Sequence, residues 1–328
     1  MATRTLVPIL ITGLLAAAVG TGCSGSTSSS AAPGKPRPAA PALTKEQAQQ
    51  VLASFAAGMN RAGLAFDGQA LRAVETDPQL SMDVAALKLR RAVRKRPPKV
   101  AFSHTTFYIP RLTGHPHWFA ADAVSGKGRR ALRHALLFTQ ARPGAPWLLA
   151  ADPYPSELAL GRVALDPEGY ATPVAPSAKD LAVAPAKLPR AHAALLTDGP
   201  RAPGATVLAD GAKTSETYKA LKAGEKTLAE RGVTLSSRFS PADYKVYGLR
   251  TQDRGAVVWY VLKQNEAYSA TRQGRLAVSG DLVGLAPSNT ARTRLDTTVL
   301  VQYLATIPPK GRATISGMYR KAVAAQGT

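Results

Sequence analysis

The sequence predicts an α+β protein with two tandem parts, in each of which helices precede an antiparallel sheet. Apolar residues recur at helical spacing over residues 44–93, and four alternating, aromatic-rich stretches follow between residues 100 and 155. The same succession returns over residues 186–326 without evident sequence repetition. A chain of 328 residues with 45% apolar side chains can bury one large core or two ordinary ones.

The first 22 residues have the pattern of an export signal. Arg4 supplies the positive start, and the mostly apolar segment over residues 6–19 is too short to span about 30 Å of hydrocarbon comfortably. Small residues then lead to Cys23, the single cysteine of the chain, at the place where a bacterial lipoprotein carries its lipidated cysteine. We therefore predict a lipoprotein signal peptide over residues 1–22 and lipidation of Cys23.

Gly20 departs from the lipobox pattern, which prefers an aliphatic residue there, so ordinary cleavage near Ala18 and release from the cell is an alternative. Two features favour the anchor. An exported chain with one cysteine can form no internal disulfide, so a free thiol would be unusual. Residues 23–42 are rich in Ser and Pro, as a flexible spacer behind an anchor requires. We expect the protein on the extracytoplasmic face of the cell membrane.

Basic residues outnumber acidic ones by 42 to 21, which gives a net charge of +21. We expect no nucleic-acid partner, because the chain carries an export signal and no motif interleaves aromatic with basic residues. The expected partners are anionic lipid headgroups, anionic wall polymer or an envelope protein. Each Lys or Arg near an anionic surface contributes about 1 kcal/mol. The alternative is that the charge only keeps the protein soluble.

The first predicted domain covers residues 43–172. Its first helix begins at Thr44, which forms a capping box with Gln47, and Gly63 is a plausible end. A second helical stretch is expected over residues 69–75. The third follows Pro78 and should end at the prolines of residues 97 and 98. Its predicted buried stripe is Met82, Ala86, Leu89 and Val93. Four strands are expected within residues 100–112, 117–126, 130–142 and 146–155.

The opposite side of the third helix carries a run of cations, which we name the basic run. It consists of Lys88, Arg90, Arg91, Arg94, Lys95, Arg96 and Lys99. These residues are candidates for contact with an anion. The alternative is a solvated face whose cations suit the carboxyl end of the helix dipole.

The second predicted domain covers residues 173–328. Helices are expected within residues 186–200 and 214–232, the second ending at Gly232. Strands are expected within residues 243–251, 255–264, 274–285 and 294–307. The segment over residues 312–326 fits a strand or a helix.

Four segments carry a resemblance to a known group of proteins: VETDPQLSMD, FYIPRLTGHPHWFAA, ALDPEGYATPV and LAVAPAKLPRAHAALLTDG. In these segments the chain resembles exported actinobacterial lipoproteins of unknown function. The resemblance implies two tandem halves, each similar to the cone-shaped α+β fold of nuclear transport factor and ketosteroid isomerase, with helices packed on a curved antiparallel sheet. Such a cone can leave a pocket. The resemblance implies no catalytic residues.

Few motifs suggest chemistry. His115 and His117 fall on one side of a strand, as metal ligands can, but Pro116 disturbs that geometry, and we expect an exposed turn followed by two core aromatics. A carboxylate base facing a tyrosine, such as Asp122 and Tyr108, would suit isomerase chemistry. Asp296 and Tyr303 lie on opposite strand faces. The sequence shows no nucleophile elbow or phosphate loop, and a Ser-His-Asp set has no local signature.

We therefore expect a membrane-anchored lipoprotein that acts as a non-enzymatic binding or scaffolding module of the cell envelope, with no cofactor, no metal and no catalytic residue. The alternative is a small-ligand pocket or a weak enzyme in one of the two cones. A third possibility is a structural partner in an envelope complex, which would need an exposed apolar patch.

Overall fold

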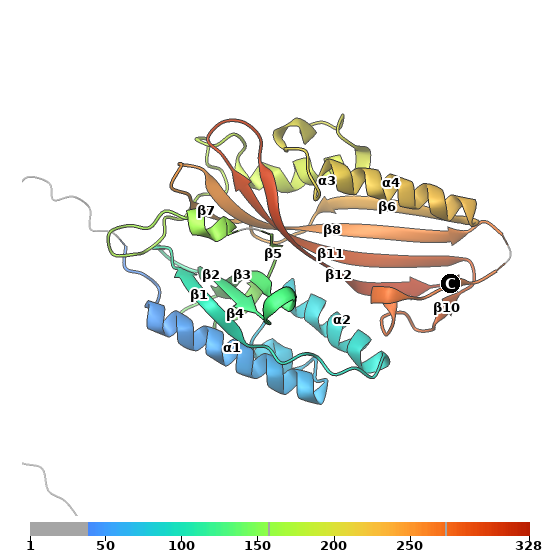
Figure 1. Cartoon of the computed structure of the whole chain (residues 1–328), viewed down its shortest axis with the longest axis horizontal. Coiled ribbons are helices and arrows are strands. Elements are labelled where there is room, and N and C mark those ends of the chain that lie inside the picture. Colours follow the sequence, from blue (N-terminus) through green and yellow to red (C-terminus); the bar gives the residue numbers. More distant parts are fainter. Residues whose placement is uncertain (1–38, 157, 273) are drawn as a thin grey trace, which may run out of the picture. The chain divides into compact units, whose positions relative to one another are not determined.

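The computed structural model describes residues 39–328 apart from residues 157 and 273 (Figure 1), and these residues form one compact unit. The predicted signal peptide, Cys23 and most of the predicted spacer lie outside the described residues. The chain joins the compact unit at Ala39, whose carbonyl oxygen accepts a hydrogen bond from Arg111 Nη1 at 3.0 Å. The fold class is α+β, as the sequence predicts.

Helix α1 (Lys45–Ala65) begins as predicted. Thr44 Oγ1 accepts from the backbone N–H of Gln47 at 3.2 Å, and Gln47 Oε1 accepts from the N–H of Thr44 at 2.8 Å. These two bonds satisfy donors that the first helical turn leaves free. The helix continues two residues past Gly63 and is ended by Phe66 in the left-handed conformation.

The short 3₁₀ helix η1 (Ala70–Ala73) leads to α2 (Gln79–Ala92), whose buried residues differ from the predicted stripe. Met82 is fully buried, but Val93 is 42% exposed, and Ala86 and Leu89 are half-buried. The reason is that α2 is covered from two directions. Met82 packs on the six-stranded sheet described below, whereas Leu80 and Leu87 pack near the end of α1.

Helix α2 also ends earlier than the prolines at 97 and 98 predict. Arg94 adopts the left-handed conformation with φ of 55°, and the N–H of Lys95 donates to the carbonyl oxygen of Arg90 at 2.9 Å. This hydrogen bond joins an N–H to the carbonyl oxygen five residues earlier, which is the bond that closes a helix in a Schellman motif. Only Lys88, Arg90 and Arg91 of the basic run therefore lie on the helix, and the other four follow it.

The four predicted strands of the first half form an antiparallel sheet in the order β1-β2-β3-β4. The strands are β1 (Phe102–Tyr108), β2 (His117–Ser125), β3 (Leu132–Gln140) and β4 (Leu148–Ala151). One face packs on α1, where Phe55 meets Phe138 edge to face at 5.6 Å. The predicted fourth strand continues as β5 (Tyr154–Pro155), which instead pairs with β12 of the second half.

A connection with the short helices η3 (Ala159–Arg162), η4 (Pro185–Lys187) and η5 (Ala205–Val207) surrounds α3 (Leu188–Asp198) and precedes α4 (Ser215–Glu230). Both α-helices were predicted. They cover one face of the larger sheet (Figure 1). No helix within the part of the chain that the structure describes is long and apolar enough to cross a membrane.

The larger sheet has the order β5-β12-β11-β8-β6, with β7 paired to β8. Its strands are β6 (Val233–Pro241), β7 (Tyr247–Arg250), β8 (Ala256–Ala270), β11 (Arg294–Ile307) and β12 (Thr314–Gly327). The segment over residues 312–326, whose sequence fits a strand or a helix, is thus a strand. Strand β6 was not predicted from the sequence. The predicted strand over residues 274–285 is reduced to β9 (Leu276–Ala277), which pairs with β10 (Thr290–Ala291) and precedes η6 (Gly280–Leu282).

Both faces of β8 are buried over its first half. Val258, Tyr260 and Leu262 face the core beneath α3, while Trp259 on the opposite face joins a core with side chains of β1, β2 and β3. Trp259 Nε1 donates to the carbonyl oxygen of Ala135 on β3 at 2.9 Å. The two sheets therefore share a core, and this shared core positions the polar groups described below.

Candidate functional site

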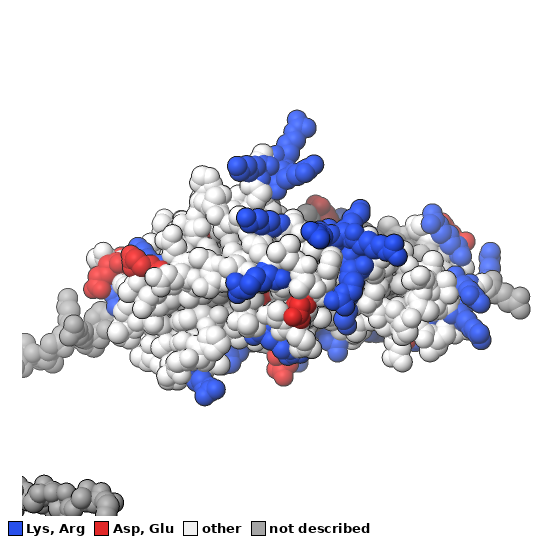
Figure 2. All heavy atoms as spheres, turned by 90° about the horizontal axis from the view of Figure 1, so that it is seen from below, with Lys and Arg blue, Asp and Glu red and all other residues white. Residues whose placement is uncertain are grey.

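The basic run lies at the end of α2 and directly after it. Six of its seven residues are exposed, and Arg90 is half-buried. Arg91 donates to the carbonyl oxygen of Phe66. None of the seven lies within ion-pair distance of an acidic side chain among the described residues. Lys and Arg outnumber Asp and Glu on the face that carries α1 and α2 (Figure 2).

A groove of about 600 Å³ lies between α2, η6 and the middle of β12, and we name it the α2 groove. Its apolar wall comes from Ala86 and Leu89 on α2 and from Val93, which follows the helix. Its polar wall carries Arg90, Arg320 and Lys321. Lys321 is nearly buried and pairs with Asp281 at 2.9 Å. The groove therefore joins the basic run to strand β12.

A second hollow of about 410 Å³, the sheet cavity, lies between α4 and the larger sheet. Its lining is mostly apolar and comes from α4, β6, β9, η6, β11 and β12. The polar exceptions include Glu266 and Tyr268 on β8, Arg275, and Arg320 on β12. Asp281 and Arg320 line the sheet cavity and the α2 groove alike, so the two hollows adjoin at these side chains.

Glu266 is nearly buried, and both of its carboxylate oxygens have donors. Oε1 accepts from Gln264 Nε2 at 2.8 Å and from Arg320 Nη2 at 2.7 Å. Oε2 accepts from the hydroxyl groups of Tyr268 and Thr297 at 3.0 and 3.1 Å. Burial and the adjacent Glu266 carboxylate raise the pKa of Tyr268, so its hydroxyl stays a neutral donor. This carboxylate is satisfied within the fold.

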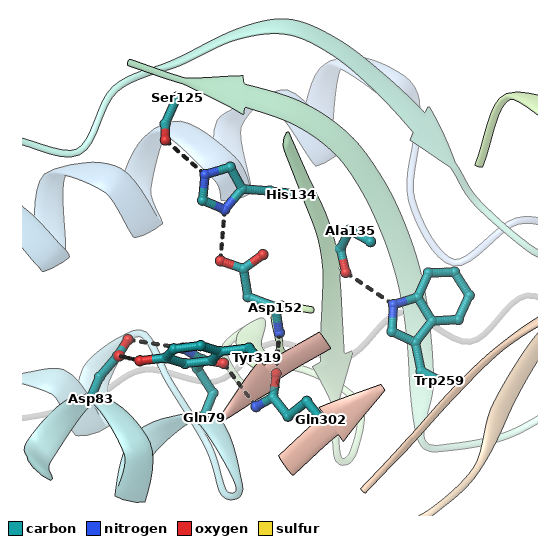
Figure 3. A network of polar contacts seen from close by, with 9 residues as sticks. All are labelled: Gln79, Asp83, Ser125, His134, Ala135, Asp152, Trp259, Gln302 and Tyr319. Carbon is teal, nitrogen blue, oxygen red and sulfur yellow. Dashed lines mark hydrogen bonds and ion pairs between the residues drawn. The ribbon is translucent and has the colours of Figure 1, made fainter. Parts of the chain in front are cut away.

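A third polar site links the two sheets (Figure 3). Ser125 at the end of β2 lies 2.7 Å from His134 Nε2, and His134 Nδ1 lies 2.8 Å from Asp152 Oδ2. An ionised Asp152 carboxylate only accepts hydrogen bonds, so Nδ1 donates to it; in the neutral imidazole Nε2 then accepts from the serine hydroxyl. The order nucleophile, base and orienting acid is that of a serine hydrolase. Neither of the two hollows above is lined by Ser125 or His134.

The same network continues into the second half of the chain (Figure 3). The N–H of Asp152 donates to Gln302 Oε1 at 2.7 Å, and Gln302 Nε2 donates to Gln79 Oε1 at 2.9 Å. Gln79 in turn donates to Asp83 at 2.9 Å. Burial raises the pKa of Asp152, opposed by the adjacent His134. Asp152 Oδ1 is buried without a hydrogen-bond partner among the described residues.

His115 and His117 stack on each other at 3.9 Å between ring centres. Trp118 and Phe119 are buried in the core, as predicted for the residues after this turn. Burial is the main cause that lowers the pKa of His117, and the neighbouring His115 lowers it further. Among the described residues, no group of three or more His, Cys, Asp or Glu side chains is arranged to hold a metal ion.

Asp122 has Arg133 as its partner rather than Tyr108. Arg133 Nη1 contacts both oxygens of Asp122, at 2.7 and 2.9 Å. Burial and the Asp122 charge raise the pKa of Tyr108 to about 12. Asp296 pairs with Arg294 at 2.8 Å, while Tyr303 is buried in the core beneath α3, so these two lie apart as predicted.

Several proteins are similar to this chain. An uncharacterised lipoprotein of Streptomyces coelicolor is 30% identical over 71% of this chain and 70% of its own length. One from Streptomyces avermitilis is 30% identical over 73% of this chain and 71% of its own length. A second from S. coelicolor is 28% identical over 94% of this chain and 90% of its own length. No solved structure matches the chain. Residues 39–327 match a domain of unknown function, DUF8094, and the chain belongs to this family of uncharacterised lipoproteins.

Proposed function

We propose that this protein is a lipid-anchored, non-enzymatic binding module on the extracytoplasmic face of the cell membrane, and that its basic run contacts anionic lipid headgroups. The observation that carries the proposal is the basic run itself: seven cations without an acidic partner among the described residues, beside a half-apolar groove. The names of the relatives support an anchor, because all three are lipoproteins.

Tethering favours a contact with the membrane over one with a distant polymer. Ala39 lies sixteen positions after Cys23, and a fully extended chain of that length reaches at most about 55 Å. A tethered cationic surface meets the headgroups at high effective concentration. Since each cation near an anionic surface contributes about 1 kcal/mol, a few cations suffice to hold the domain against the bilayer.

The test uses the full chain with Cys23→Ser, which carries no lipid, as the parent protein. Two triple variants made in this protein are compared with it. Arg94→Gln, Lys95→Gln and Arg96→Gln remove three exposed cations of the basic run. Flotation with vesicles of equal parts phosphatidylglycerol and phosphatidylcholine should show affinity weakened by about 3 kcal/mol, roughly a hundredfold.

The matched control removes three exposed cations from α4 and the residue after it, through Lys219→Gln, Lys226→Gln and Arg231→Gln. It should bind the vesicles as the parent protein does. Equal weakening in both triple variants would show that only total charge matters. Binding to purified wall polymer but not to vesicles would contradict the lipid contact.

The anchor itself is tested in cells with a clickable fatty acid. The unaltered protein should incorporate the label and remain with membranes washed at high salt, and the Cys23→Ser protein should lose the label and be released by that wash, which screens the contact of the basic run. A Cys23→Ser protein that stays membrane-bound after the high-salt wash, with the unaltered protein found unlabelled in the medium, would contradict the anchor.

A second candidate, acyl transfer to water, is favoured by one observation, the Ser125-His134-Asp152 arrangement. In such a reaction His134 Nε2 takes the hydroxyl proton as Ser125 Oγ attacks the carbonyl carbon of an ester, and it then gives that proton to the alcohol that leaves. Water, deprotonated by the same nitrogen, afterwards releases the acyl group as an acid and restores the Ser125 hydroxyl. A fluorophosphonate probe should then label the parent protein, and Ser125→Ala and His134→Ala should abolish labelling. Absence of labelling in the parent protein would leave the set as a purely structural network.

We also infer that each half is a cone-shaped domain of the type found in nuclear transport factor, with a boundary near residues 172 and 173. Support comes from the repeated succession of helices and an antiparallel sheet, with α1 on one sheet and α3 on the other. An experimental structure with a sheet curved around its helix in each half would test the inference.

A further inference from the structure

We propose that the sheet cavity binds one single-chain anionic amphiphile, with the alkyl chain inside the cavity and the anionic head at its junction with the α2 groove. This site differs from the surface contact proposed above. It would bind a soluble ligand without a bilayer, and it does not require the cations of residues 94–99.

The interior of the sheet cavity suits an alkyl chain. Side chains from five elements turn apolar groups toward it: Leu228, Val233, Leu276, Leu282, Leu295 and Val299. Its volume of about 410 Å³ lies within the range of small-ligand sites, which are lined mostly by apolar groups with a few polar ones. Such a lining gains by excluding water when an alkyl chain enters.

The junction of the two hollows suits an anion. Arg275 and Arg320 line the sheet cavity, and Arg90 and Lys321 line the adjoining α2 groove. Two carboxylates, Glu266 and Asp281, oppose these four cations, which leaves a net charge of +2 at the junction. An anionic head would lower this excess.

The contacts of the charged side chains at the junction also argue against a cationic ligand. The four donors on Glu266 occupy its oxygens, so that carboxylate is not free for an amine of a ligand. Arg320 uses Nε and Nη2 for Gln264 and Glu266, and its side chain is still 38% exposed. Arg275 is exposed and forms no ion pair with a described acidic residue. Both guanidinium groups can therefore donate to a carboxylate or phosphate head.

The test is a titration of the Cys23→Ser full chain with three ligands of one chain length: dodecyl phosphate, dodecanoate and the neutral dodecanol. Calorimetry should show saturable one-to-one binding of an anionic ligand, below its micelle concentration. The two anions separate a phosphate-headed from a carboxylate-headed source. Arg275→Gln should weaken anion binding about tenfold and leave dodecanol unchanged.

Arg292→Gln is the matched control, because Arg292 is exposed in the segment before β11 but does not line the sheet cavity. It should bind as the parent protein does. Leu282→Trp should fill the cavity and abolish binding of all three ligands with an unchanged unfolding temperature. No saturable binding of either anion, or equal affinities in Arg275→Gln and Arg292→Gln, would overturn the proposal.

The basic-run triple variant separates this site from the proposed membrane contact. It should bind the anionic ligand with unchanged affinity, even though its affinity for vesicles falls. Loss of both properties in that variant would contradict a separate cavity site.

Discussion

Trp259 Nε1 donates a hydrogen bond to the carbonyl oxygen of Ala135, 2.9 Å away, and thereby fixes strand β8 of the larger sheet to strand β3 of the smaller one. Trp259 is 1% exposed, so its ring belongs to the core that the two sheets share. The two halves of the chain are thus packed through a buried and directional contact.

We expect Trp259→Phe to lower the free energy of unfolding by about 2–4 kcal/mol. The change removes buried volume and leaves the Ala135 carbonyl without this donor. Urea unfolding followed by circular dichroism measures the loss. Trp147→Phe is the control: Trp147 is half-buried beside α1 and should cost less. Equal losses in the two variants would contradict a special role of the shared core.

Arg94 ends α2 in a conformation that costs a residue with a side chain about 1 kcal/mol relative to glycine. Arg94→Gly should therefore raise the free energy of unfolding by about 0.5–1 kcal/mol. Arg96→Gly removes the same charge from a position without a positive φ and should bring no gain. A gain shared by both variants would point to charge repulsion instead.

His192 gives the protein a defined acid sensitivity. Its Nε2 donates to the Lys213 carbonyl at 2.8 Å, its Nδ1 accepts from Tyr260, and burial lowers its pKa from 6.5 to about 4. Between these pH values the unfolded chain binds the proton and the folded protein does not. The free energy of unfolding should therefore fall as the pH drops from 6.5 to 4, by up to about 3 kcal/mol.

Urea unfolding at pH 7 and pH 4.5 measures this dependence. His192→Gln keeps an amide donor but cannot bind the proton, so it should lose most of the pH-dependent decrease. His104→Gln, at an exposed position, should retain it. If His192→Gln and the parent protein lose the same stability, His192 is not the group responsible.

Glu75 should change the free energy of unfolding with pH in the direction opposite to His192. It is 1% exposed, neither carboxylate oxygen has a hydrogen-bond partner among the described residues, and burial with the nearby Asp83 raises its pKa well above the usual range. The folded protein holds this proton at pH values where the unfolded chain releases it. Glu75 therefore lowers stability as the pH rises through that interval.

Glu75→Gln should remove this loss. Thermal unfolding should show the variant close to the parent protein at pH 5 and more stable at pH 8. Glu230→Gln, at an exposed position on α4, should match the parent protein at both values. If the Glu75→Gln variant and the parent protein lose the same stability between pH 5 and pH 8, the raised pKa of Glu75 is contradicted.

Local signals in the sequence predict the elements well where one side of the chain is buried. The capping box at Thr44 and the strand β11 appear as predicted, because side-chain caps and alternation act over a few residues. The stripe on α2 is wrong because that helix is buried from two directions. Strand β6 was missed because its alternating residues are only half-buried.

The candidate sites depend on contacts that local patterns do not encode. Ser125, His134 and Asp152 meet because β2, β3 and β4 are neighbours, and no motif spans the three. Glu266 and Arg320 lie 54 residues apart in sequence on strands β8 and β12. The basic run alone could be identified in advance, because charge density is a property of one short segment.

The salt dependence of vesicle binding tests the central claim most directly. Contact between the basic run and anionic headgroups predicts that the affinity of the Cys23→Ser chain for phosphatidylglycerol vesicles falls steeply as sodium chloride is raised, since the Debye length shrinks from about 10 Å at 0.1 M to about 3 Å at 1 M. The triple variant of Arg94, Lys95 and Arg96 should show a much shallower fall. An affinity that stays constant across this range of salt would contradict the account.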